Sequence, residues 1–209
     1  MPSAPAYTRL SVDKRRRLLI DTGSELFARH AFEEISMREI ASAAGVSKGL
    51  LYHYFPSKTA LFTAAVAEYA AELAQLLQPD VTDPPIEQLA RTLERYLSWI
   101  EEHSGTWTKL MQSAGSVPEA RAITESFRAQ TLQSVLARLS PNAEPAPVLR
   151  NALRGWLGYI DAAIVDWVTH RDLSRDQLRD SLTAAFVASV DSAQRLDPDV
   201  RVALAERTA

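Results

Sequence analysis

The sequence predicts an all-α protein. Apolar residues recur at spacings of three and four along most of the 209 residues, as expected for helices with one buried face. No stretch alternates apolar and polar side chains as a half-buried strand would, and glycine and proline fall between the periodic segments. With 46% hydrophobic and 23% charged residues, the composition is that of a globular protein with a substantial core.

Two helices are predicted in the first 45 residues. The first spans about 12–30 and begins with the basic run 14–17. The second begins near Met37, because Ser36 and Glu39 form a capping box in which each side chain bonds the backbone amide of the other residue. The chain therefore opens with a longer helix and a second helix, separated by a loop.

A third and a fourth helix are expected to follow closely. The second helix should end at Gly45, since glycine adopts a left-handed C-terminal cap without strain. Ser47 then caps a short third helix over 48–55. Ser57 caps a fourth helix over about 58–77, which contains neither glycine nor proline. Its length predicts a rod that connects a compact head to a larger body.

The body is predicted to hold five more helices. Capping signals open three of them, with Asp83 before two prolines, a box from Ser116 and a box from Ser174. The five helices are expected over about 84–103, 105–114, 117–139, 148–169 and 175–196. The resulting organisation is a flexible arm over 1–11, a head over 12–56 and a body over 57–209.

Several kinds of protein are excluded or disfavoured by composition. The absence of cysteine excludes disulfides, thiolate metal sites and cysteine nucleophiles. The longest charge-free apolar stretches, 59–67 and 183–190, are too short to span a membrane, and no signal-peptide pattern opens the chain. The histidines show no metal-ligand spacing, and no phosphate-binding glycine motif is present. We expect a cytoplasmic protein with no cofactor, no metal, no membrane contact and no enzymatic activity.

The charge is unevenly distributed along the chain. Residues 1–64 carry nine basic and six acidic residues, whereas residues 65–209 carry 14 basic and 20 acidic residues. A basic head on an acidic body suggests a polyanionic partner for the head, and a chance distribution explains the difference equally well.

The second and third helices and the turn between them form a predicted helix-turn-helix, in which the second of the two helices can enter the major groove of DNA. The most specific stretches of sequence here are Leu26-Phe27, Phe32, Ile35-Ser36-Met37-Arg38-Glu39-Ile40-Ala41, Ala44-Gly45-Val46-Ser47-Lys48-Gly49-Leu50-Leu51-Tyr52-His53-Tyr54-Phe55, Ser57-Lys58 and Leu61-Phe62. In these residues the chain closely resembles the N-terminal domain of TetR-type bacterial transcriptional regulators, over about 12–62. Beyond residue 62 the resemblance lies in the number and length of the helices.

This resemblance implies that the third helix reads DNA bases with its first residues. Lys48 can reach guanine O6 or N7, and Gly49 lets the backbone approach the bases. Leu50 can contact a thymine methyl group, although a leucine here could simply be exposed. By contrast, Leu51 is predicted to belong to the head core, together with Val46, Tyr54 and Phe55.

The remaining implied DNA contacts are to phosphates. Ser36 and Ser47 cap helices whose amide-lined N-termini favour phosphate, and Tyr52 and His53 can donate to phosphate oxygens. Lys58 lies in the first turn of the fourth helix, where its charge opposes the helix dipole, and a nearby phosphate would explain it. Taken alone, Lys58 is an ordinary solvated lysine, as is Lys48.

The resemblance also implies an effector pocket between the helices of the body. Large side chains of the body are the candidates for its lining, and ordinary core packing is the alternative for each of them. These candidates are Tyr96, Trp99, Trp107, Met111, Phe127, Trp156 and Tyr159. Asp161 and Asp166 interrupt the apolar helix over 148–169 and are expected to face solvent or pair at an interface, with effector contact as the second choice.

A two-fold dimer through the last two helices is expected, because the helix over 148–169 is apolar on nearly all sides and carries small residues. The candidate interface residues are Ala152, Gly155, Gly158, Phe186 and Val190. The resemblance thus implies a homodimeric repressor that binds a pseudo-palindromic double-stranded operator and is released by a small-molecule effector. The alternative is a dimeric helical effector-binding or scaffold protein without sequence-specific DNA readout.

Overall fold

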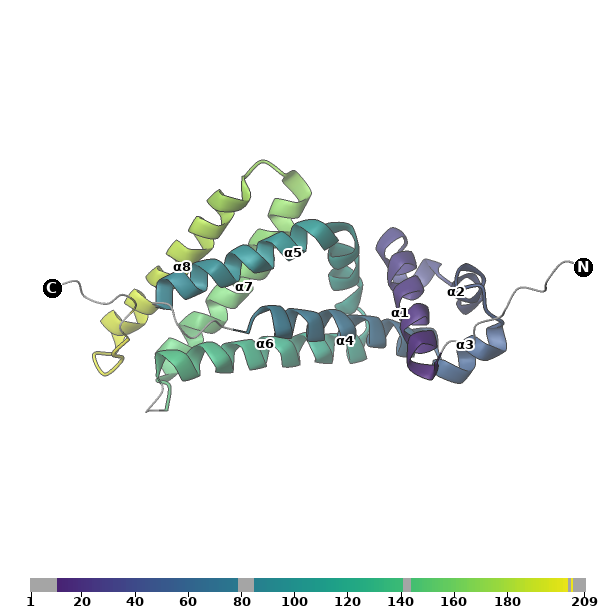
Figure 1. The fold of residues 1–209 in the computed structure, drawn as a ribbon. Helices are drawn as coiled ribbons and strands as arrows, with labels where there is room; N and C mark the ends of the chain where they lie inside the picture. The colour runs from purple at the N-terminus through teal and green to yellow at the C-terminus, as the bar shows by residue number, and fades with distance from the viewer. Residues whose placement is uncertain (1–10, 79–84, 141–143, 203, 205–209) are drawn as a thin grey trace, which may run out of the picture.

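The computed structural model describes residues 11–78, 85–140, 144–202 and 204 of the chain. All regular elements in these ranges are helical (Figure 1), which confirms the all-α prediction. The elements are α1 (Val12–Arg29), the 3-10 turn η1 (Phe32–Glu34), α2 (Met37–Ala43), α3 (Lys48–Tyr54), α4 (Lys58–Leu76), α5 (Pro85–Ala114), α6 (Pro118–Leu139), α7 (Pro147–His170) and α8 (Arg175–Leu196). The predicted arm lies largely outside the described residues, as do Asp83 and Pro84.

The predicted caps at the start of the chain are present in the structure. The Glu39 amide donates to Ser36 Oγ at 3.2 Å, and the Ser36 amide donates to Glu39 Oε2 at 2.7 Å. Ser47 Oγ accepts from the Leu50 amide at 3.1 Å and so caps α3. Gly45 has φ of 63°, the left-handed conformation that the turn between α2 and α3 requires. The local sequence therefore determines where α2 and α3 begin and where the turn between them lies.

The predicted boundary between two helices near Gly105 is wrong. Helix α5 runs without interruption from residue 85 to 114. A glycine inside a helix lowers its stability by only about 1 kcal/mol, which tertiary packing can exceed. Here Ile100, Trp107 and Leu110 on either side of the glycine are all buried. Their packing holds both halves of α5 in one helix.

The predicted capping box at Ser116 is also wrong. Helix α6 begins one residue later than expected, with Val117 as its N-cap and Pro118 in the first turn. The Ser116 hydroxyl instead donates to the Ser113 carbonyl at 2.8 Å. Proline lacks an N–H and is favoured at the first helical position, so Pro118 determines where α6 begins.

The buried apolar side chains form two clusters. The first, here named the head core, combines α1–α3 and the first half of α4 with the corner between α5 and α6. Its members are Leu19, Ile20, Phe27, Ile35, Met37, Ile40, Ala41, Leu51, Phe55, Leu61, Phe62, Ala65, Val66, Leu110, Ala114, Val117 and Ala120. The second cluster, the body core, joins the end of α4 to α5–α8. Helices α4 and α5 therefore contribute to both cores, and the head core extends past residue 56.

Helix α4 leaves the head and continues into the body alongside α6 (Figure 1). It packs closely on α1, where Gly23 has no side chain and the Leu61 side chain lies against the glycine. A Cβ at residue 23 would lie 3.1 Å from Leu61 Cδ2. The glycine therefore permits an approach of α1 and α4 that most other residues would hinder.

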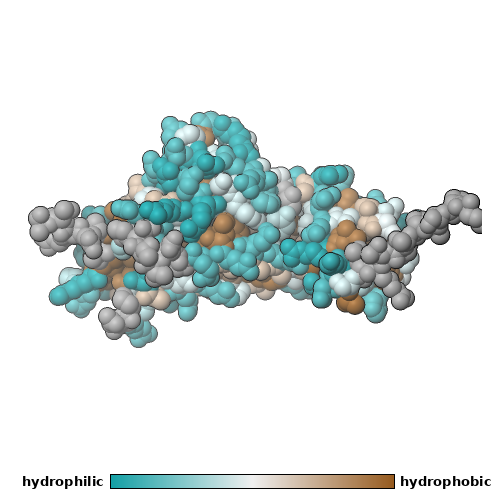
Figure 2. Space-filling view, in the orientation of Figure 1, coloured by the Kyte–Doolittle hydropathy of each residue, from teal (hydrophilic) through white to brown (hydrophobic). Residues whose placement is uncertain are grey.

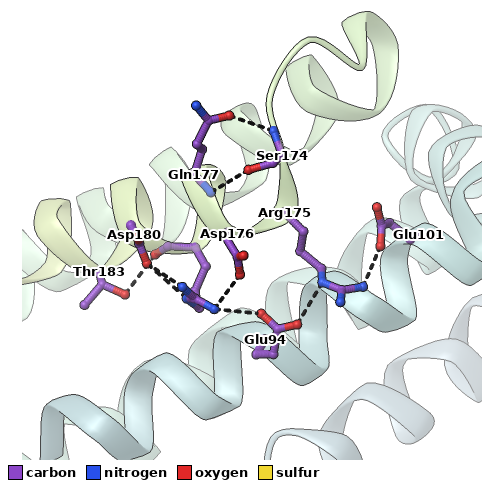
Figure 3. Close-up of polar contacts among 9 residues, drawn as sticks. Glu94, Glu101, Ser174, Arg175, Asp176, Gln177, Asp180 and Thr183 are labelled. Carbon is purple, nitrogen blue, oxygen red and sulfur yellow. Dashed lines mark hydrogen bonds and ion pairs between the residues drawn. The ribbon is translucent and has the colours of Figure 1, made fainter.

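Helix α8 is connected to α5 by a network of ion pairs (Figure 3). Arg175 contacts Glu94 at 2.8 Å and Glu101 at 2.7 Å. Arg179 contacts Glu94 at 3.2 Å and Asp176 of its own helix at 2.7 Å. Partly exposed ion pairs each contribute about 1 kcal/mol or less, so this network mainly sets how α8 lies along α5.

The surface seen in Figure 2 is largely hydrophilic, with small hydrophobic areas in the head and in the middle of the body. None of the described helices is long and apolar enough to cross a lipid bilayer.

Candidate DNA-binding surface and ligand cavity

Helix α3 is fixed to the head by its inner face. Leu51 is fully buried and Phe55 is nearly so, while Val46 and Tyr54 pack against the same core. These are the residues that the sequence assigns to the head core, and that prediction is confirmed. The opposite face of α3 is therefore left to solvent or to a ligand.

The predicted DNA contacts on α3 lie largely on this free face. Lys48, Gly49, Tyr52 and His53 are exposed, whereas Leu50 is only partly so. The Lys48 ammonium lies 5.6 Å from the centre of the Tyr52 ring, which places a cation and a phenol hydroxyl side by side near the start of the helix. Such a surface offers one positive charge and several donors to a polyanion.

Ser36 and Ser47 are exposed at the starts of α2 and α3. Each hydroxyl oxygen accepts a backbone amide of its own helix, so the hydroxyl hydrogen stays free to donate to an anion. Both caps leave further amides of the first turn pointing outward. Their predicted phosphate contacts are compatible with this geometry and stay predictions.

Lys58 has a partner within the protein. Its ammonium donates to the Phe32 carbonyl at 2.6 Å and to the Glu33 carbonyl at 3.4 Å, and it lies 4.4 Å from the centre of the Phe32 ring. The lysine thus binds carbonyls of η1 and offsets the unfavourable end of its own helix dipole. This contact explains Lys58 without a phosphate, and its predicted DNA contact stays a prediction.

A cavity of about 250 Å³ lies in the body among α4, α5, α6, α7 and α8. Tyr96, Phe127 and Trp156 line it, as the sequence suggests. Much of the remaining wall is apolar and comprises Ala74, Leu77, Pro85, Leu89, Leu93, Val135, Leu139, Leu157, Ile160 and Phe186. A largely apolar cavity with a few polar groups is the usual form of a small-molecule site.

The other side chains expected in the pocket do not line this cavity, and their predicted effector contacts stay predictions. Trp99 stacks on His103 with ring centres 4.4 Å apart, and Trp107 is buried in the body core. Met111 packs between the two cores. Tyr159 is 43% exposed, with its hydroxyl 3.1 Å from Ser181 Oγ. Helical periodicity identifies large residues that avoid water, but it does not tell a cavity wall from a packed core.

A polar bridge joins α6 to α7 at the cavity wall. Arg128 Nε donates to Asp161 Oδ2 at 2.7 Å, and the same guanidinium contacts Glu125 at 2.9 Å. Burial raises the pKa of the Asp161 carboxyl, and the Arg128 charge opposes that rise. Burial and the Asp161 charge together raise the pKa of the Tyr96 hydroxyl, so it stays protonated. Asp161 is thus paired within the chain, whereas Asp166 is exposed beside His170.

Comparison with known proteins identifies both parts of the molecule. Residues 19–65 match the bacterial regulatory proteins of the tetR family, and residues 85–189 match the tetracyclin repressor-like C-terminal domain. The chain belongs to the TetR family. It is therefore a transcriptional regulator with a helix-turn-helix DNA-binding domain.

Several known proteins are similar to most of the chain. A tetR-family transcriptional regulator from Streptomyces coelicolor is 30% identical, with a TM-score of 0.82 over 91% of this chain and 86% of that one. The transcriptional repressor KstR of Mycobacterium tuberculosis is 25% identical over 93% of this chain and 82% of its own length. FadR of Bacillus subtilis, solved with stearoyl-CoA, shares the fold at 20% identity, with a TM-score of 0.67 over 83% of this chain and 98% of that one. This chain spans only 44% and 66% of the length of two further curated relatives.

The residues predicted for a TetR-type dimer interface separate into two groups. Gly155 and Gly158 are exposed, and a Cβ at either position would meet no other atom within 4 Å. Ala152 is half-buried against the body core. Phe186 and Val190 are buried inside the same protomer, with Phe186 edge-on to Trp156, so they are not free to contact a partner. This corrects the prediction for Phe186 and Val190. An apolar stripe on a helix does not show whether it packs against its own chain or against a partner chain.

Two basic residues at the start of α1 are absent from the predicted contacts. Arg17 Nη1 pairs with Glu68 Oε2 at 2.6 Å, and Arg16 lies 3.7 Å from the same carboxylate. The Arg16 guanidinium also lies 5.4 Å from the centre of the Phe55 ring, at the end of α3. Both arginines remain about half exposed. The basic run at the start of α1 is the sequence signal that could have identified them.

Proposed function

We propose that this TetR-family regulator is a repressor that binds a pseudo-palindromic operator as a homodimer and is released by a small organic molecule in the body cavity. Lys48, Gly49 and Leu50 read bases in the major groove. Ser36, Ser47, Tyr52, His53 and Lys58 are proposed to contact phosphates. The protein acts in the cytoplasm and requires no cofactor.

The observation that carries this proposal is that the cavity and the head share two helices. Helix α4 contributes Ala74 and its C-cap residue Leu77 to the cavity, and Leu61 to the head core. Helix α5 contributes Leu93 to the cavity and Leu110 to the head core. A ligand releases DNA only if it binds better to a state in which the two heads are wrongly spaced. Shifts of α4 or α5 around a ligand would change the position of the head.

Dimerisation is proposed through the free faces of α7 and α8. Gly155 and Gly158 present backbone without side chains on an exposed part of α7, where a second helix can approach closely. A two-fold axis there would place two α3 helices for two half-sites centred about 10 bp apart, or a multiple of that spacing.

A named relative supports a ligand in the body. FadR of Bacillus subtilis has been solved with stearoyl-CoA and has the same fold. At 20% identity this supports the presence of a ligand-binding cavity, and the chemistry of the ligand must come from the residues of this chain.

Genomic footprinting with the purified protein tests the DNA half of the proposal. We expect protected sites that contain two inverted half-sites, and a gel shift that a scrambled half-site abolishes. Sedimentation at the same concentration should show a dimer. Binding without sequence preference would contradict the proposal and favour the alternative of a helical scaffold or effector-binding protein. A promoter fused to the recovered site then reports whether the regulator represses.

A further inference from the structure

The cavity has an apolar middle between two polar ends. Leu93 of α5, Val135 of α6 and Ile160 of α7 lie in its wall, so the middle suits a hydrocarbon portion of a ligand. Helix α6 contributes an arginine near each end, Arg128 and Arg138. Ten residues separate them, which corresponds to about 15 Å along the helix axis. The two arginines therefore mark the two ends of an elongated site.

The charge at the Arg128 end is already balanced. The Arg128 guanidinium contacts the carboxylates of Asp161 and Glu125, and Glu125 also pairs with Arg154 at 3.1 Å. Two cations and two anions thus meet there. An added anion would face the negative charges of Asp161 and Glu125, so this end suits a neutral group.

The charge at the Arg138 end is not balanced. Arg138 Nη1 donates to Gln88 Oε1 at 2.7 Å, which joins α6 to α5 across the cavity through a neutral partner. Among the described residues no carboxylate forms an ion pair with Arg138. Arg138 is exposed at this end of the cavity. Desolvation lowers the pKa of its guanidinium, yet an arginine keeps its charge at neutral pH. Within the described ranges the site therefore holds one positive charge without an ion-pair partner beside an apolar wall.

We infer that the cavity binds an amphipathic organic anion, with its carboxylate on Arg138 and its hydrocarbon part between α5 and α7. This inference rests on the proposed effector function and names the chemical class of the effector. A guanidinium binds a carboxylate through two parallel charge-assisted hydrogen bonds. A cationic ligand would be repelled at this end, and a neutral ligand would leave the charge unmatched.

Three eight-carbon probes of different charge test the inference: octanoate, 1-octanol and octyltrimethylammonium. Isothermal titration calorimetry with the full-length protein should show octanoate binding most tightly. Arg138→Gln should weaken octanoate binding about tenfold and change octanol binding less than twofold, because only the charged hydrogen bond is lost. Arg138→Lys keeps the charge but loses the two parallel hydrogen bonds, so its affinity for octanoate should lie between those of the unmodified protein and Arg138→Gln. Arg121→Gln removes an exposed arginine from the start of the same helix, outside the cavity lining, and is the matched control.

Two outcomes would overturn the inference. One is that octanoate binds no better than octanol or the cation, which includes the case in which none of the three binds. The other is that Arg138→Gln binds octanoate as the unmodified protein does. A gel shift on the footprinted operator separates this inference from the proposed function. If a neutral or cationic compound releases DNA and octanoate does not, the proposed regulatory function stands. The inference that the effector is an anion is then refuted. Binding of octanoate that depends on Arg138 but does not release DNA confirms the site and refutes its role as an inducer site.

Discussion

Replacing Leu110 by alanine should destabilise the DNA-binding head, although Leu110 belongs to α5. Its side chain is fully buried in the head core, next to residues of α1 and α4. A buried leucine truncated to alanine leaves a cavity and lowers the free energy of unfolding by about 2–5 kcal/mol. We expect about 3 kcal/mol here, a large share of the roughly 5–15 kcal/mol that stabilises a typical protein.

For a chain of this length, a loss of about 3 kcal/mol should lower the melting temperature by about 6–12 °C. Thermal unfolding followed by circular dichroism measures this, at matched protein concentration because a dimer melts in a concentration-dependent way. Operator affinity should fall in parallel, since α3 is fixed to the same core. Leu196→Ala is the control, because that side chain is 73% exposed and its loss should change stability by about 0.5 kcal/mol or less.

A loss of stability below about 1 kcal/mol for Leu110→Ala would refute the reasoning, since that value is typical of a site without close packing. Normal operator binding by a strongly destabilised variant would separate head stability from DNA recognition. That result would also exclude α5 as the helix that couples the cavity to DNA binding.

Four further predictions concern the DNA-binding surface. Operator affinity should fall linearly with the logarithm of salt concentration through counterion release, and a flat response in gel shifts would contradict phosphate contacts. Lys48→Ala should weaken operator binding by about 1–3 kcal/mol and relax the preference at one base pair of each half-site, whereas Lys109→Ala on the exposed surface of α5 should not. Lys58→Met should lower the free energy of unfolding by about 1 kcal/mol because η1 loses its bound ammonium, and an unchanged melting curve with weaker DNA binding would instead identify a phosphate contact. Glu68→Gln should free Arg17 and its neighbour from α4 and so tighten binding to all DNA sequences, with a steeper salt dependence. Weaker binding by Glu68→Gln would show that the carboxylate positions the arginines for DNA.

The sequence predicts the head well because its features are local. A capping box, a left-handed glycine and a serine cap each act over about four residues, and all are present as expected at Ser36, Gly45 and Ser47. The error at Gly105 has the opposite origin. Whether a glycine ends a helix depends on what packs around it, and Leu110 shares the head core with Leu19 and Phe27, which lie more than 80 positions earlier in the chain. No local pattern carries that information.

The lining of the body cavity could be predicted only in part for the same reason. Tyr96 and Trp156 line it, yet Trp99 and Tyr159 have similar size and polarity and do not. The polar ends were harder still to predict. Arg138 meets Gln88 across 50 positions of sequence, and Arg128 meets Asp161 across 33. Pairings of this kind follow from the way helices pack, which a single sequence does not specify.

The corner between α5 and α6 also limits how this protein can be recombined with its relatives. A fragment that ends after α3 would leave Leu19 and Phe27 without the covering side chains of α4, and one that ends within α4 would still lack Leu110 and Val117. Grafting the first 56 residues onto another regulator would therefore join two surfaces that did not evolve together. A workable chimera must therefore import the matching corner of α5 and α6 together with the head.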